Sequence, residues 1–272
     1  MTATVRAQTL SLSDVSLAFG GVKAMTDVSF TVAPGTVHAV IGPNGAGKSS
    51  TFNVISGIYR ATSGTVTYGD HVLTSMRPSD IARLGIGRTF QNIALTPSDP
   101  VIDNLMVARH RLTKAGYLGT ALRLPRVARQ ERLHRERVVD LATFVGIEDL
   151  LGRPAGTLSY GQRKKVELAR ALATEPDLLL LDEPAAGLPT HEKVDMAATI
   201  RAIAEGLGAS VLLVEHDMPL VMGVADHVSV LDFGRLIADG TPREVQNSAA
   251  VIAAYLGEQD PSDPPHHESV GA

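Results

Sequence analysis

The first 75 residues alternate between hydrophobic and polar positions, which predicts β-strands. The apolar residues of the first stretch are spaced mostly by two: Leu10, Leu12, Val15, Leu17 and Phe19. This is the period of a strand with one buried face. Apolar segments at 28–32 and 37–41 predict two more strands, and the second leads into a helix over 48–56. A segment at 65–73, interrupted by Gly69 and Asp70, predicts a small hairpin.

From residue 158 onward the pattern changes to continuous apolar runs separated by helical segments. The runs lie at 178–182, 210–215 and 228–235, and a helix is predicted over about 192–206. Strands that are apolar on both faces are typical of a parallel sheet covered by helices on each side. The sequence therefore predicts an α/β fold with a mostly parallel core sheet.

The region from about 92 to 156 has few strand signals and is rich in Arg, Leu and Ala. Within it, residues 127–145 carry many charges, with Leu133, Val138, Leu141 and Val145 at helical spacing. This pattern predicts an exposed amphipathic helix. The last residues, 258–272, are rich in Pro, Asp and Ser, and we expect them to be a disordered tail.

Composition removes several classes of function. The 272 residues include no cysteine, which excludes disulfides, thiolate metal sites and cysteine nucleophiles. The net charge of -4 gives no indication of nucleic acid as a partner. The longest stretch without a charged side chain, 28–47, is broken by glycine and proline, so no membrane-spanning helix is expected. No signal peptide is expected at the amino terminus either, and a cytoplasmic location is predicted.

Residues 42–49 match the phosphate-binding pattern G-x-x-x-x-G-K-[ST] at every fixed position, between a predicted strand and a predicted helix. Glycines let backbone N–H groups converge on phosphate oxygens at the positive end of the helix. Lys48 would reach the terminal phosphates of ATP, and the hydroxyl of Ser49 would bind Mg²⁺. The predicted nucleotide-binding residues are Gly42, Pro43, Asn44, Gly45, Ala46, Gly47, Lys48, Ser49 and Ser50.

Two adjacent carboxylates follow the apolar run at 178–181. Asp182 would end a buried parallel strand, where it could hold Mg²⁺ directly or through water. Glu183 would then polarise the water that attacks the γ-phosphate. An acid after an apolar strand is also a common way for a strand to reach the surface, so this pattern gains its weight from the phosphate loop before it.

Residues 158–162, L-S-Y-G-Q, followed by a helix rich in Arg and Ala, resemble the signature of ATP-binding cassette (ABC) proteins. With the phosphate loop and L-L-L-L-D-E-P, the resemblance covers about residues 8 to 257. It implies that Ser159, Gly161 and Gln162 contact nucleotide, with Tyr160 where glycine is commoner. Taken alone, Ser159 and Gln162 could equally form the cap of a helix.

The same resemblance implies roles for three further residues. Gln91, in R-T-F-Q-N, is similar to the glutamine that touches Mg²⁺ and senses the membrane partner. His216 is similar to the histidine that contacts the γ-phosphate, and Phe19 to the aromatic residue that packs on adenine. An isolated histidine or phenylalanine at a strand end is more often a packing residue.

One position departs from the family pattern. Pro189 stands in the loop after Glu183 where Asp or Asn is usual, and this loop connects the two nucleotide sites of the family's dimers. Proline has no N–H and a fixed φ. We therefore expect the coupling between sites to be altered.

The resemblance implies a P-loop ATPase of the ABC type over residues 1–257, with an antiparallel β subdomain and a helical subdomain at about 92–160. R-T-F-Q-N, the Arg-rich insertion and the ending V-I-A-A-Y-L-G-E resemble the larger ATPase subunit of branched-chain amino acid importers. Implied partners are a second ABC ATPase subunit, multi-span permease subunits and, indirectly, an extracytoplasmic solute-binding protein, at the cytoplasmic face of the membrane. Urea, amide or lipopolysaccharide transport, a non-transport ABC ATPase and a nucleotide-binding protein without turnover stay open.

Overall fold

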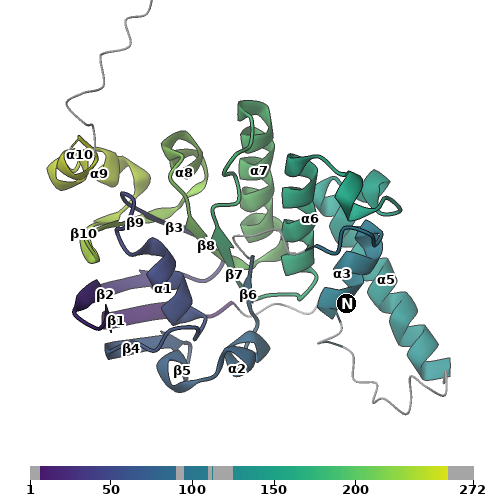
Figure 1. Cartoon of the computed structure of the whole chain (residues 1–272), viewed down its shortest axis with the longest axis horizontal. Coiled ribbons are helices and arrows are strands. Elements are labelled where there is room, and N and C mark those ends of the chain that lie inside the picture. The colour runs from purple at the N-terminus through teal and green to yellow at the C-terminus, as the bar shows by residue number, and fades with distance from the viewer. Residues whose placement is uncertain (1–6, 90–94, 110–111, 113–124, 257–272) are drawn as a thin grey trace, which may run out of the picture.

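The structure is a computed structural model that describes residues 7–89, 95–109, 112 and 125–256 (Figure 1). Gln91 and the predicted tail at 258–272 lie outside the described residues. The described chain forms two sheets with helices around them. None of its described helices is both long enough and apolar enough to cross a membrane.

The smaller sheet is antiparallel and is built from the amino-terminal strands predicted by alternation. Its order is β2-β1-β4-β5, formed by β1 (Leu10–Phe19), β2 (Val22–Val32), β4 (Ser63–Tyr68) and β5 (His71–Val72). β2 begins six residues earlier than the predicted strand at 28–32. Gly20, with φ of 58°, turns the chain tightly enough for β2 to pair with β1 from its first residue.

The larger sheet confirms the predicted α/β fold. Its order is β10-β9-β3-β8-β7-β6, and β10 alone runs antiparallel to its neighbour. The parallel strands are β3 (Val37–Ile41), β6 (Ile86–Arg88), β7 (Leu178–Asp182), β8 (Ser210–Val214) and β9 (His227–Asp232). The apolar run predicted as one strand at 228–235 is divided, because Phe233 and Gly234 both have positive φ and reverse the chain into β10 (Arg235–Gly240).

Alternate residues of the core strands pack into two different hydrophobic clusters. In β7, Leu178 and Leu180 join a cluster with the small sheet and helix α1 (Lys48–Ile55), while Leu179 and Leu181 face a cluster formed with the long helices. These long helices include α6 (Tyr160–Leu172) and α7 (Thr190–Ala202). Because both faces of the sheet are covered, its strands are apolar on both sides, as their sequences predict.

The helices that the sequence predicts lie close to their expected positions. The predicted amphipathic helix at 127–145 is α5 (Pro125–Val145), with Val138, Leu141 and Val145 buried and Leu133 exposed. It packs with α3 (Val101–Arg109) and α6. The helix predicted over 192–206 is α7, which continues as a π-helical turn at Ile203–Leu207. The remaining α-helices are α2 (Pro78–Arg83), α8 (Met218–Val224), α9 (Pro242–Gln246) and α10 (Ala249–Leu256).

Candidate nucleotide-binding site

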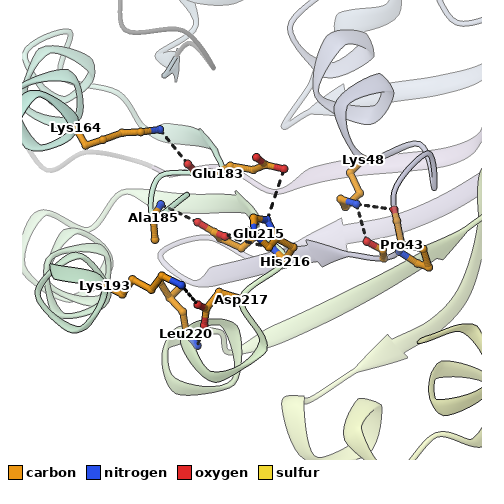
Figure 2. A network of polar contacts seen from close by, with 11 residues as sticks. Pro43, Lys48, Lys164, Glu183, Ala185, Lys193, Glu215, His216, Asp217 and Leu220 are labelled. Atoms are coloured by element: carbon orange, nitrogen blue, oxygen red, sulfur yellow. Dashed lines mark hydrogen bonds and ion pairs between the residues drawn. The ribbon is translucent and has the colours of Figure 1, made fainter. Parts of the chain in front are cut away.

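The register of the large sheet brings three loops to one edge. Val214 of β8 pairs with Val40 of β3 on one side and with Asp182 of β7 on the other. The chain therefore leaves all three strands at nearly the same level. The phosphate loop, Glu183 and the segment after Val214 meet at the carboxyl edge of a parallel sheet, where ligands bind in folds of this type (Figure 2).

The backbone of the phosphate loop requires glycine at two close contacts. Gly42 and Gly47 have φ of 148° and 100°. A Cβ at Gly42 would lie 2.0 Å from the carbonyl oxygen of Leu231, and one at Gly47 would lie 2.8 Å from the carbonyl oxygen of Ala24. No larger residue fits without displacing the neighbouring strand. The loop is therefore held between β9 and β2 in one conformation.

The start of α1 leaves backbone donors available. Gly47 is the N-cap residue, no side chain caps the helix, and its first turn contains no acidic residue. The N–H groups of a first helical turn have no partner within the helix, and the helix dipole adds positive potential there. The exposed side chains of Asn44 and Ser49 lie beside these donors in the sequence. The arrangement is that of an anion-binding site.

Lys48 folds back onto its own loop. Its side chain is buried, and Nζ donates to the carbonyl oxygens of Gly42 at 2.6 Å and Pro43 at 2.7 Å (Figure 2). The cation is thus held within the loop by carbonyl groups. To contact a terminal phosphate as predicted, Nζ would exchange carbonyl oxygens for phosphate oxygens.

Asp182 is buried at the end of β7, with only one of its two oxygens satisfied by protein. Oδ2 forms an ion pair with Nη2 of Arg88 at 3.1 Å, and Arg88 also donates to Asn53 of α1 at 2.8 Å. Oδ1 is buried and has no partner in the described part of the chain. A buried carboxylate oxygen without a donor fits the predicted Mg²⁺ ligand. Arg88 was not predicted, since nothing local in the sequence pairs residues 94 positions apart.

Glu183 and His216, both predicted as functional residues, lie together. Oε1 of Glu183 is 3.8 Å from Nδ1 of His216 (Figure 2). The Glu183 side chain is 31% exposed and the His216 side chain 60%, so both are open to a ligand. Glu183 has φ of 49°, a left-handed conformation that is rare for a residue with a side chain. Such strain often occurs at functional sites.

Glu215 is a site residue that the sequence analysis missed. Its side chain is fully buried, accepting hydrogen bonds from the backbone N–H of Ala185 at 2.8 Å and of His216 at 3.2 Å. Burial raises the pKa of Glu215 above its ordinary value. The carboxyl group ties the loop after β7 to the loop after β8, and so fixes Glu183 relative to His216. An acid ending an apolar strand, as in Asp182, was the signal that could have revealed it.

Asp217 anchors the next turn of the chain. It caps α8 by accepting from the N–H of Leu220 at 3.0 Å, and it pairs with Lys193 of α7 (Figure 2). The hydrogen bond from Lys193 lowers the pKa of Asp217. The segment that carries His216 is thereby fixed at both ends.

The predicted signature residues begin α6 and form a helix cap. Oγ of Ser159 accepts from the N–H of Gln162 at 3.2 Å, and Oε1 of Gln162 accepts from the N–H of Ser159 at 3.0 Å. The capping alternative is therefore what the side chains do within this chain. Both bonds use acceptor oxygens, so the hydroxyl hydrogen of Ser159 and the amide group of Gln162 have no partner among the described residues. A cap of this kind is compatible with binding a phosphate.

Phe19 is exposed, whereas Gly161 is buried against α7. The Phe19 ring, at the end of β1, is 48% exposed and packs edge-on against Tyr59 at 5.0 Å between centroids. A Cβ at Gly161 would lie 1.9 Å from a carboxylate oxygen of Glu192 on α7. Gln91 lies outside the described residues, so its predicted contact stays a prediction.

Two models of known protein families match this chain. The family model described as ABC transporter matches residues 25–186, more than half of the chain. The chain belongs to the ABC transporter family. A second model, described as branched-chain amino acid ATP-binding cassette transporter, matches residues 235–261 of the cassette. The cassette is accordingly an ATPase, and the resemblance inferred from its motifs is confirmed.

Similar proteins cover almost the whole cassette. It is 39% identical to the high-affinity branched-chain amino acid transport ATP-binding protein BraF of Pseudomonas aeruginosa, over 92% of this chain and 98% of that protein. It is 38% identical to LivG of Escherichia coli, a protein of the same description, over the same shares. Among solved structures, an ATP-binding cassette of an ABC transporter in its ADP conformation aligns with a TM-score of 0.80 and 31% identity. That alignment covers 92% of this chain and 99% of the other.

Pro189 fits the local structure of the cassette without strain. It is the N-cap residue of α7 with φ of -66°, and its carbonyl accepts from the N–H of Lys193 at 3.0 Å. An N-cap residue needs no N–H donor within its helix, so proline is tolerated there. The expected effect of Pro189 on coupling between nucleotide sites stays a prediction.

Proposed function

We propose that this cassette is the ATP-hydrolysing subunit that powers a membrane importer of branched-chain amino acids. The observation that carries the proposal is the approach of Glu183 to His216, at the sheet edge shared with the phosphate loop. The names of the similar proteins and the match at residues 235–261 support the substrate class.

In this proposal the phosphate loop binds ATP through its backbone. The N–H groups at the start of α1 and the side chains of Asn44, Ser49 and Ser50 surround the phosphates, and Lys48 contacts the terminal ones. Pro43, Gly45 and Ala46 shape the loop between them. The exposed ring of Phe19 packs against adenine, with Tyr59 supporting its edge.

The buried Oδ1 of Asp182 and the hydroxyl of Ser49 are the proposed ligands of Mg²⁺, together with Gln91. Bound Mg²⁺ would neutralise charge on the β- and γ-phosphates. Arg88 holds Oδ2 of Asp182 and so orients the carboxylate toward the ion with its other oxygen.

Glu183 is the proposed general base. Its partly exposed carboxylate accepts a proton from the attacking water, while His216 contacts the γ-phosphate and Lys48 stabilises the charge on the leaving phosphates. The buried Glu215 fixes the two loops that carry Glu183 and His216. Each of these groups lies at the edge where β3, β8 and β7 end.

We further propose that two ATPase subunits assemble around two ATP molecules. The unpartnered donors of Ser159 and Gln162 would close the nucleotide site of the partner subunit, with Gly161 in the same helical turn. The dimer would sit at the cytoplasmic face of the membrane on permease subunits, with a helical subdomain at about 92–160 and one cassette domain over residues 1–257. An extracytoplasmic solute-binding protein would deliver the substrate.

The test is purification from a membrane extract followed by reconstitution. The chain should co-purify with a multi-span membrane protein, and the assembled complex should hydrolyse ATP faster when loaded binding protein and leucine are present. Urea and a short-chain amide serve as competing substrates in the same assay. Stimulation by urea or amide but not by leucine would overturn the substrate class, and absence of ATP hydrolysis in the complex would overturn the whole proposal.

A further inference from the structure

Lys164 is an unusually buried lysine beside the site. It lies on α6, and only 6% of it is exposed. Lysines that are buried to this extent usually pair with a carboxylate. In the part of the chain that the structure describes, Lys164 has no such pair. Its Nζ donates to the carbonyl oxygen of Glu183 at 3.1 Å and lies 5.8 Å from the centre of the Tyr160 ring.

The carbonyl that Lys164 contacts belongs to the strained residue of the site. The N–H of Glu183 donates to the carbonyl oxygen of Val214 at 2.9 Å, and its carbonyl oxygen accepts from the N–H of Ala186 at 3.3 Å as well as from Nζ of Lys164. A left-handed conformation costs free energy for any residue with a side chain, so it persists only where neighbouring groups hold it. The direction of the Glu183 carboxylate therefore depends on these three contacts, of which the one from Lys164 comes from α6.

Helix α6 connects this contact to the signature residues. It starts at the Ser159 cap, and Lys164 lies five residues further along the same helix. An α-helix of 13 residues moves as a rigid element, so a displacement of its first turn also displaces Lys164. Figure 2 shows Lys164 reaching Glu183 from α6 while His216 approaches the carboxylate from the segment after β8.

We propose that Lys164 is a positioning residue, which holds the backbone of Glu183 in its catalytic conformation and makes that conformation depend on the position of the signature helix. The inference rests on the proposed function, in which Glu183 is the base and Ser159 closes the partner's nucleotide site. When the signature residues close the partner's nucleotide site, α6 would move, and the contact of Lys164 with the backbone of Glu183 would change with it. In this proposal Lys164 acts through the backbone of Glu183 and not on the nucleotide.

The neighbouring Lys165 provides a matched control. It lies on the same helix, is more exposed, and pairs with Asp195 of α7 at 3.6 Å rather than with Glu183. Lys164→Met keeps the apolar stem and removes the donor, Lys164→Arg keeps a cation, and Lys165→Met removes a charge of equal size one residue away. If Lys164→Met unfolds near the assay temperature, Lys164→Gln replaces it as a shorter side chain without charge.

The experiment measures kcat and KM for ATP hydrolysis by the assembled transporter, together with equilibrium ATP binding. Lys164→Met is expected to lower kcat about ten- to one-hundred-fold, the effect of a misplaced catalytic group. KM and ATP affinity should change by less than about two-fold, because the phosphate loop is untouched. Lys164→Arg should recover most of kcat, and Lys165→Met should resemble the wild type.

A parallel Glu183→Gln variant tests the proposed role of Glu183 separately from the proposed role of Lys164. Loss of turnover in Glu183→Gln with normal kcat in Lys164→Met would overturn the role of Lys164 alone. Normal turnover in Glu183→Gln would instead overturn the proposed function of the site. An equal loss of kcat in Lys165→Met, or a loss of ATP affinity in Lys164→Met that matches the loss of kcat, would show that Lys164 only supports the fold.

Discussion

The phosphate loop and the signature segment bind the same kind of ligand in the proposal, yet they are built in opposite ways. In the phosphate loop, backbone geometry does the work: Gly42 and Gly47 take conformations in which a Cβ would collide with β9 or β2, and α1 begins without a cap. In the signature segment, Ser159 and Gln162 cap their own helix and keep only their donor hydrogens available.

The difference shows how one chain can contribute its phosphate loop to one nucleotide site and its signature segment to another. The phosphate loop has a converging set of backbone donors and can bind an anion without help. The signature segment begins a helix in which the side chain of Ser159 already occupies the N–H of Gln162, and it offers two side-chain groups at an exposed helix start. It is therefore suited to complete a site formed mainly by another subunit.

Removing the cation of the phosphate loop should have the largest effect. Lys48→Ala is expected to abolish ATP hydrolysis, at least about a hundred-fold below wild type, and to weaken nucleotide binding severely, since Lys48 contacts the terminal phosphates in the proposed function. Turnover in the assembled transporter and binding of a fluorescent ATP analogue measure the two effects, with thermal unfolding as the check on folding. Wild-type turnover in this variant would contradict the reading of the loop.

Changing the signature cap should affect turnover but not binding to the single chain. Ser159→Ala removes the cap acceptor, at a cost of about 1 kcal/mol in stability, together with the free hydroxyl donor. Turnover should fall about ten-fold, because the proposed hydrogen bond from the Ser159 hydroxyl to a phosphate in the partner's site is lost. The ATP affinity of the isolated chain should stay unchanged. Both quantities are measured on the same preparations.

The chain contains its own control for the capping effect. Thr241 and Glu244 form a second capping box at the start of α9, outside the site. Thr241→Ala should cost a similar amount of stability and leave turnover unchanged. If the two variants lost turnover equally, the signature would act through helix stability and not through a ligand.

An effect on stability alone is expected at His38, on the strand that leads into the phosphate loop. His38 of β3 is buried against Phe30 and donates or accepts at 2.8 Å with Ser229. Burial, and after it the charge of His227, lowers the pKa of His38 to about 4. Between pH 6.5 and about 4 the unfolded chain binds a proton at His38 and the folded chain does not. The free energy of unfolding therefore decreases as the pH is lowered through this window.

The expected loss is up to about 3 kcal/mol, from the difference between the folded and unfolded pKa of His38. Urea unfolding at pH 7 and pH 5 for the wild type and for His38→Gln gives the measurement. The wild type should lose more stability on acidification than the variant. Identical losses would show that the acid sensitivity lies elsewhere, for example among the helices that follow the signature.

The elements of the fold could be predicted largely because their causes are local. Periodicity alone indicated α5 to within two residues of its start, and β3, β7 and β8 as buried strands. It failed at Phe233, where a reversal of the chain inside an apolar run leaves no periodic signal. β6, α2, α3, α8, α9 and α10 were not predicted, and none of them is longer than 9 residues.

The site residues could be predicted where a sequence motif fixes the local backbone conformation. The contacts between side chains of different elements could not. The phosphate loop residues, Asp182, Glu183 and His216 were all named from sequence, and the structure brings Glu183 and His216 together. The contacts of Arg88 with Asp182, Lys164 with Glu183 and Glu215 with Ala185 join different elements. No pattern in the sequence contains such distances, since they follow from how the elements pack.

The central claim, that Glu183 is the base of an ATPase site closed by a second subunit, is tested most directly by Glu183→Gln. This change keeps size and hydrogen bonding but removes the basic oxygen. ATP occupancy and turnover are measured together in the assembled transporter with Mg²⁺. We predict that ATP stays bound while turnover falls by about two to four orders of magnitude. Normal turnover in this variant, with ATP trapped instead by Asp182→Asn, would contradict the account.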